Sequence, residues 1–160
     1  VINKDVKQLW DALFSTTIKL ETIGLAARDT LRLEKGFCLY GNDINDFTSP
    51  IEAGLGWITK FTKEFVNSVN LKKQKEEGTS RRLVAIELVD KGIARKDYPI
   101  VDKNGEEIGV VTSGTMSPTL NKSIALGYVK SEYKSVDSDI YIQVRKKQIK
   151  AKVVSLPFVK

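Results

Sequence analysis

The residues best suited to chemistry are four charged side chains in one short segment. They are Arg28, Asp29, Arg32 and Glu34. In a helix, Arg28 and Arg32 would share a face, and Asp29 would lie within reach of Arg32. An arginine held by a carboxylate is suited to binding a planar or anionic ligand. The same spacing also describes a salt-bridged helix face, in which each pair contributes only a few tenths of a kcal/mol, and the pattern alone favours this second interpretation.

The composition excludes several other kinds of site. The chain has 160 residues, no histidine and a single cysteine, Cys38. Without histidine, a Ser-His-Asp triad, a Cys-His pair and a histidine-ligated metal site are impossible within these residues. One thiol makes neither an internal disulfide nor a thiolate zinc site, so we predict no metal site. No glycine-rich phosphate loop is present, and the hydroxyl-rich stretch 112–118 is expected to be a turn that satisfies its own backbone.

The chain is basic, with 26 Lys and Arg against 20 Asp and Glu and a net charge of +6. This excess suits nucleic acid, an anionic small molecule or an acidic protein, but we favour an ordinary solvated surface. The aromatic and basic residues near 133–150 fit a hairpin surface better than a nucleic-acid site. No stretch approaches the roughly 18 apolar residues of a membrane span. The lone cysteine gives no sign of an oxidising compartment, and the expected location is the cytoplasm.

The elements that must position these residues change character along the chain. Apolar residues recur at helical spacing in three segments: 4–19, 24–35 and 63–77. Gly36 provides a C-terminal stop for the second helix. In the third helix, Phe65, Val66 and Val69 are expected to face inward. The first helix is amphipathic and needs a surface to pack against, most naturally a sheet, although few strands are available nearby.

After residue 78 the apolar pattern changes to the alternation of strands. Six short strands are expected: 82–88, 99–101, 107–111, 124–129, 140–145 and 148–154. Turn residues at 102–105 and 146–147 would close two hairpins. The fold class is therefore α+β, with a helix-rich part at 1–78 and a small antiparallel barrel or jelly roll at 79–160.

Four blocks of sequence carry a resemblance to a known family. They are GLAARDTLRLE (24–34) with LYGNDI (39–44), PIEAGLGW (50–57), GVVTSGTMSP (109–118) with IALGYV (124–129), and LPFV (156–159). Over essentially its whole length, the chain resembles the T-protein of the glycine cleavage system, a tetrahydrofolate-dependent aminomethyltransferase. The resemblance implies that residues 1–78 are the helix-rich end of a folate-binding domain plus a connector, and that 79–160 are its C-terminal β-barrel domain.

The resemblance also implies a reaction. In this family the methylene of an aminomethyl group on the lipoyl arm of the H-protein passes to tetrahydrofolate, and ammonia is released. Arg28 matches the family arginine that contacts the folate, and Phe37 falls where some relatives place a tyrosine against the cofactor. Lys160 matches a basic tail that approaches the pocket. Asp29, Arg32 and Glu34 are expected in supporting roles.

The other folate-binding residues of the family belong to its first half, which would precede Val1. No catalytic residue is therefore assigned, and the chain alone is expected to be inactive because half a pocket cannot hold two reactants. Two alternatives remain open. One is the folate-binding C-terminal module of a sarcosine- or dimethylglycine-oxidising enzyme. The other is a non-catalytic basic module that docks a protein or nucleic acid.

Overall fold

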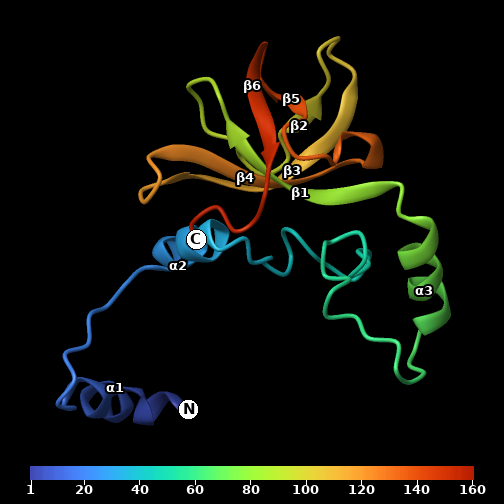
Figure 1. Cartoon of the computed structure of the whole chain (residues 1–160). Helices are drawn as coiled ribbons and strands as arrows, with labels where there is room; N and C mark the ends of the chain where they lie inside the picture. The colour runs from blue at the N-terminus through green and yellow to red at the C-terminus, as the bar shows by residue number, and fades with distance from the viewer.

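Six antiparallel strands close into a barrel in the second half of the chain (Figure 1). They are β1 (Arg81–Leu88), β2 (Pro99–Val101), β3 (Glu107–Ser117), β4 (Lys122–Lys130), β5 (Asp139–Val144) and β6 (Lys147–Val154). Their order around the barrel is β1-β4-β3-β2-β5-β6, and β6 pairs with β1 to complete the circle. The computed structural model describes all residues, 1–160. The predicted small antiparallel barrel is confirmed.

Three α-helices precede the barrel. They are α1 (Val6–Phe14), which follows a short 3-10 turn at Asn3–Asp5, α2 (Leu25–Glu34) and α3 (Ser68–Glu77). In Figure 1, α2 lies against the barrel beside the C-terminus, and α1 stands apart from it. An extended segment joins α1 to α2, and α1 shares no core with the barrel.

The strand β4 shows how the helix and the barrel are joined. Every residue from Ser123 to Val129 is buried, although a strand with one wet face would alternate. The inward side chains belong to the main apolar core of the barrel. The outward side chains Ile124 and Leu126 pack with Leu33 of α2, which is only 1% exposed. The strand is therefore covered on both faces because α2 is docked on the outside of the barrel.

Helix α1 is amphipathic, as expected, but its apolar face is uncovered. The helix is shorter than the predicted 4–19, and none of its residues is buried. Trp10 and Phe14 stack with ring centroids 4.8 Å apart and are 54% and 42% exposed. The surface that this face was expected to pack against is absent from residues 1–160.

The prediction for the third helix was wrong in its first turn. The helix begins at Ser68 because Asn67, its N-cap, has a left-handed backbone with φ of 66°. Phe65, Val66 and Val69, expected inward, are 38%, 95% and 80% exposed. The apolar residue that α3 does bury is Leu71.

The predicted turn at 112–118 was also wrong. Strand β3 continues through Thr112 to Ser117, and the turn follows at residues 118–121. The strand extends because Ser113–Ser117 pair with Lys122–Leu126 of β4, after a register shift between Val111 and Ser113. Its hydroxyl groups are satisfied across the barrel surface by side chains from α2 and the following loop, as described below.

Candidate functional site

A buried carboxylate joins α2, the loop that follows it and the barrel. Asp43 has no exposed surface. Its Oδ2 accepts a hydrogen bond from Arg32 Nη1 at 2.5 Å and from the Leu39 backbone N–H at 2.9 Å. Its Oδ1 accepts from Thr112 Oγ1 of β3 at 2.5 Å. Tyr128 of β4 donates its hydroxyl to the Asp43 carbonyl at 2.9 Å. The carboxylate thus has the pairing that a buried charge requires.

Arg32 uses its whole guanidinium in this arrangement. Besides Asp43, it donates from Nε to Asp29 Oδ1 at 2.8 Å and from Nη2 to Ser113 Oγ at 2.8 Å. Its Nη1 also donates to the backbone carbonyl of Phe37 at 3.0 Å. The predicted contact between Asp29 and Arg32 is present, but it is one part of a larger network in which Arg32 connects the helix to the barrel.

Glu34 makes a second connection between α2 and the end of β3. Its carboxylate accepts from Ser117 Oγ at 2.5 Å and from Thr119 Oγ1 at 3.0 Å. Burial by itself would raise the pKa of Glu34, but these hydrogen bonds outweigh it and the pKa lies below its ordinary value of 4.5. The side chain is therefore held in its charged form against the strand.

The C-terminal tail closes over the end of α2. The Val159 N–H donates to the Glu34 carbonyl at 3.0 Å, and Lys35 Nζ donates to the Val159 carbonyl at 3.0 Å. Gly36 has a left-handed φ of 73°, and a Cβ there would lie 2.6 Å from Leu156 Cδ2. Only glycine combines that backbone conformation with such a close approach of the tail.

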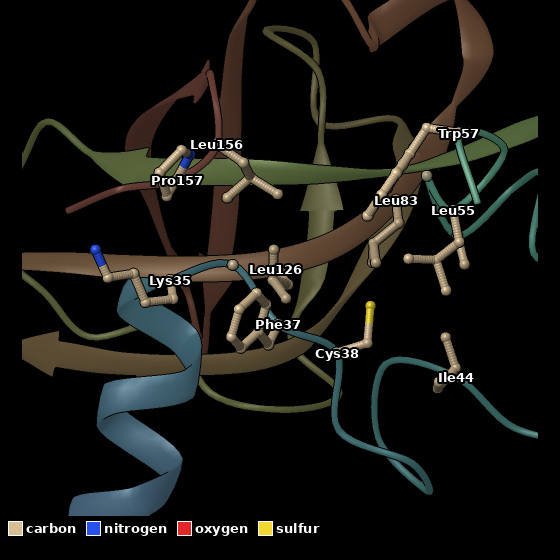
Figure 2. A pocket seen from close by; sticks show the side chains of 13 residues that line it. Lys35, Phe37, Cys38, Ile44, Leu55, Trp57, Leu83, Leu126, Leu156 and Pro157 are labelled. Atoms are coloured by element: carbon tan, nitrogen blue, oxygen red, sulfur yellow. The ribbon is translucent and has the colours of Figure 1, made fainter. Parts of the chain in front are cut away.

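An apolar hollow of about 750 Å³ opens between the end of α2, the loop that follows and the tail (Figure 2). It is lined by Lys35, Gly36, Phe37, Cys38, Ile44, Ala53, Gly54, Leu55, Trp57, Leu83, Leu126, Leu156 and Pro157. Figure 2 shows side chains from the loops and from two barrel strands facing a shared space. Burial and the nearby Asp43 raise the pKa of the Cys38 thiol. The hollow suits a flat or alkyl group, because Lys35 is its one charged side chain and no acid–base pair lies in it.

The three residues expected to bind a cofactor lie in different surroundings. Phe37 lines the hollow and is 66% exposed. Arg28 is exposed on α2, forms no salt bridge and does not line the hollow. Lys160 is exposed at the chain end, next to the Val159 that is tied to α2. The structure therefore places all three on or beside one element, α2, without bringing their side chains into one pocket.

Sequence reasoning missed the functional importance of three residues in this region. Lys35 was not singled out, and Asp43 and Trp57 were noted only within matching blocks. Asp43 and Lys35 tie the loop and the tail to α2, and Trp57 lines the hollow. An aspartate in the run Gly41-Asn42-Asp43 reads as a turn residue, so the sequence carries no signal that its carboxylate is buried. Among all 160 residues, no group of three or more His, Cys, Asp or Glu lies close enough to hold a metal ion. No helix is long and apolar enough to cross a membrane.

These features define a small antiparallel barrel with a helix docked on its outer face and an apolar hollow beside the helix. Both the barrel and the helical part of the chain match known family models. Residues 81–160 match the glycine cleavage T-protein C-terminal barrel domain, and residues 1–63 match the GCVT N-terminal domain. The chain belongs to the glycine cleavage T-protein family.

Individual relatives agree with the family match. An aminomethyltransferase from Flavobacterium psychrophilum is 61% identical over 160 residues, which is 99% of this chain and 44% of the relative. One from Bacteroides thetaiotaomicron is 57% identical over 154 residues, or 94% of this chain and 43% of the relative. The crystal structure of the glycine cleavage system aminomethyltransferase T from Bartonella henselae has a TM-score of 0.88 and 35% identity, covering 98% of this chain and 44% of that one. The chain thus spans less than half the length of these relatives.

Proposed function

We propose that this chain forms the C-terminal part of a tetrahydrofolate-dependent aminomethyltransferase. The complete enzyme transfers the methylene of an aminomethyl group from the lipoyl arm of the H-protein to tetrahydrofolate and releases ammonia. Residues 1–78 form the end of the folate-binding domain with its connector, and 79–160 form the C-terminal barrel domain. The names of the close relatives support this reaction over that of a sarcosine- or dimethylglycine-oxidising enzyme. The reaction takes place in the cytoplasm.

The single observation that best supports a folate site is the unpaired guanidinium of Arg28 on a helix whose last turn is held against the barrel. Arg32, one turn later, is 10% exposed in its side chain and fully engaged, whereas Arg28 has no ionic partner. A guanidinium with this freedom presents a planar set of donors to a ligand with carboxylate or ring nitrogen acceptors. Phe37 offers a ring face beside the hollow, and Lys160 supplies a second positive charge near the same helix.

The uncovered face of α1 supports the view that the catalytic site needs more than these residues. Leu9, Trp10 and Leu13 are 46%, 54% and 47% exposed, and a helix rarely leaves such a face in water. In the complete enzyme, this face packs into the core of the folate-binding domain. The chain alone then lacks part of the pocket and releases no ammonia, because transfer requires both reactants to be held in near-attack geometry.

The partner that delivers the aminomethyl group is the lipoylated H-protein. The net charge of +6 favours an acidic partner, and long-range attraction between opposite charges raises the rate of association at low salt. We expect the transfer rate with subsaturating H-protein to fall as salt rises. A rate that does not respond to salt would show that the basic surface has no part in steering.

The experiment that tests the proposed function measures tetrahydrofolate affinity and ammonia release together. Arg28→Ala in the complete enzyme is expected to weaken folate binding by about 1.5–3 kcal/mol, the range for hydrogen bonds to charged groups. The matched control is Arg95→Ala, which removes another exposed arginine from the barrel and should leave affinity unchanged. Equal affinities for the Arg28 variant and the unmodified enzyme by calorimetry would remove Arg28 from the folate site. Ammonia release by the chain alone would refute the need for the rest of the domain.

A further inference from the structure

The fully buried Asp43 lies where α2, the loop that follows it and the barrel meet. Its carboxylate receives donors from three separate parts of the chain: Arg32 on α2, Leu39 in the following loop and Thr112 on β3. A charge buried in this way contributes little net stability compared with an apolar residue of similar size. What it does provide is orientation, since the hydrogen bonds of a charged pair hold the two side chains and the elements that carry them in one geometry.

The orientation of the Arg32 side chain affects the positions of two residues that are proposed to contact the folate, Arg28 and Phe37. Arg28 lies one turn before Arg32 on α2, so the rotation of the helix about its axis sets where the Arg28 guanidinium points. The same Nη1 atom that binds Asp43 also donates to the Phe37 carbonyl at 3.0 Å. One guanidinium therefore connects the helix that carries Arg28 with the backbone that carries Phe37, whose N–H is also bonded to the Arg32 carbonyl at 2.8 Å.

One feature separates this connection from the other contacts of α2. Glu34 and Leu33 also hold the last turn of the helix to the barrel, Glu34 through Ser117 and Leu33 by packing against Ile124 and Leu126. Arg32, in the same turn, also donates to the Phe37 carbonyl and to Asp43 in the loop that follows. The connection through Asp43 alone joins the helix, that loop and the barrel. Loss of Glu34 would loosen only the contact between the helix end and β3, whereas loss of the Asp43 contacts would weaken the attachment of the helix, the loop and β3 to one another.

We propose that Asp43 and Arg32 form a positioning pair for folate binding: they hold Arg28 and Phe37 in one orientation against the barrel without touching the ligand themselves. This inference rests on the proposed function. It predicts that altering the pair raises the KM for tetrahydrofolate while kcat stays nearly constant, because a contact present in both the ground state and the transition state has been weakened.

Arg32→Lys is the most informative variant. Lysine keeps the positive charge near Asp43 but lacks the fork that reaches Asp29, Phe37 and Ser113 together. In the complete enzyme, the KM for tetrahydrofolate is expected to rise about tenfold, since a small misplacement of a binding group has effects of this order or larger. Asp43→Asn is the second variant. Its amide oxygen can still accept from Arg32, and its NH₂ can donate to Thr112, whose hydroxyl already lies 3.2 Å from the Leu126 carbonyl. We expect a smaller rise in KM and a retained fold.

Glu34→Gln is the matched control, because it weakens another polar connection between α2 and β3. It should lower the midpoint of thermal unfolding and leave the folate KM unchanged. If Arg32→Lys and Asp43→Asn lower the unfolding midpoint but also leave the KM unchanged, the pair is structural only and the inference is wrong. An unmodified enzyme that does not bind tetrahydrofolate by calorimetry would instead refute the proposed function, so the two failures are distinguishable.

Discussion

Replacing Gly36 with alanine should separate the contribution of backbone conformation from that of the C-terminal tail. At φ of 73°, alanine is strained by about 1–2 kcal/mol. Its Cβ would also lie 2.6 Å from Leu156 Cδ2, and the leucine must leave its preferred rotamer at a cost of about 0.5–1.5 kcal/mol. We therefore expect Gly36→Ala to lower the free energy of unfolding by about 1.5–3.5 kcal/mol, the sum of these two terms.

Urea unfolding of four proteins resolves the two contributions: the unmodified chain, Gly36→Ala, Leu156→Ala and the double variant. In the Leu156→Ala background the clash is absent, so Gly36→Ala should cost only the backbone strain, and the cycle should show a coupling of about 0.5–1.5 kcal/mol. Gly24→Ala is the control, since a Cβ there meets nothing within 4 Å and its backbone is extended. Strictly additive effects of the two substitutions would refute the close approach of the tail to Gly36.

Two further predictions concern titration. The pKa of Glu34 is lowered by folding, so an unfolded chain takes up its proton first. The stability that this carboxylate contributes is complete near pH 7 and is lost as the pH falls below 4.5 through the lowered pKa. Urea unfolding should show the difference between the unmodified chain and Glu34→Gln shrinking over that range, and a difference that is constant with pH would contradict the assignment. Because the thiolate is the reactive form, the raised pKa of Cys38 predicts that iodoacetamide alkylates the folded chain more slowly than the urea-unfolded chain at pH 8. The difference between the two alkylation rates should narrow above pH 9.0, where the folded thiol also begins to ionise. Equal rates in the two states would show that the thiol is freely solvated.

The sequence predicted well those elements whose pattern is local. The helix α2 differs from the expected 24–35 by only one residue at each end. Its C-terminal end was predictable because Gly36 adopts the left-handed conformation that ends a helix. The turn at 102–105 closes a hairpin, since the Asp102 carboxylate accepts from the backbone N–H groups of Asn104 and Glu106. Hydrogen bonds of this kind bring together residues two to four positions apart, and residue type alone indicates them.

The elements that were predicted wrongly depended on contacts distant in the sequence. The hydroxyl-rich segment at 112–118 reads as a turn, but Thr112, Ser113 and Ser117 find their partners in Asp43, Arg32 and Glu34, all more than sixty positions away. Periodicity carries no information about such pairs. For α3, the apolar spacing suggested an inward face, yet a single left-handed residue at Asn67 moved the start of the helix past Phe65 and Val66.

The charged cluster in α2 allowed two interpretations, a salt-bridged helix face and a ligand-binding arginine. In the structure, the first applies to Arg32 and the second remains open for Arg28. The helical spacing puts Arg28 and Arg32 on one face, and the sequence alone favours a salt-bridged surface for both. In the structure, Arg32 is turned into the barrel interface and bonded to four partners, so the salt-bridge interpretation applies to it, although the pairing is buried and reaches far beyond the helix. Arg32 pairs with Asp29 and Asp43, and Glu34, the other carboxylate of α2, is bonded to Ser117 and Thr119, so no carboxylate forms a salt bridge with Arg28. The structural use of one arginine thus leaves the other charged and exposed, which is the condition that a ligand-binding arginine requires.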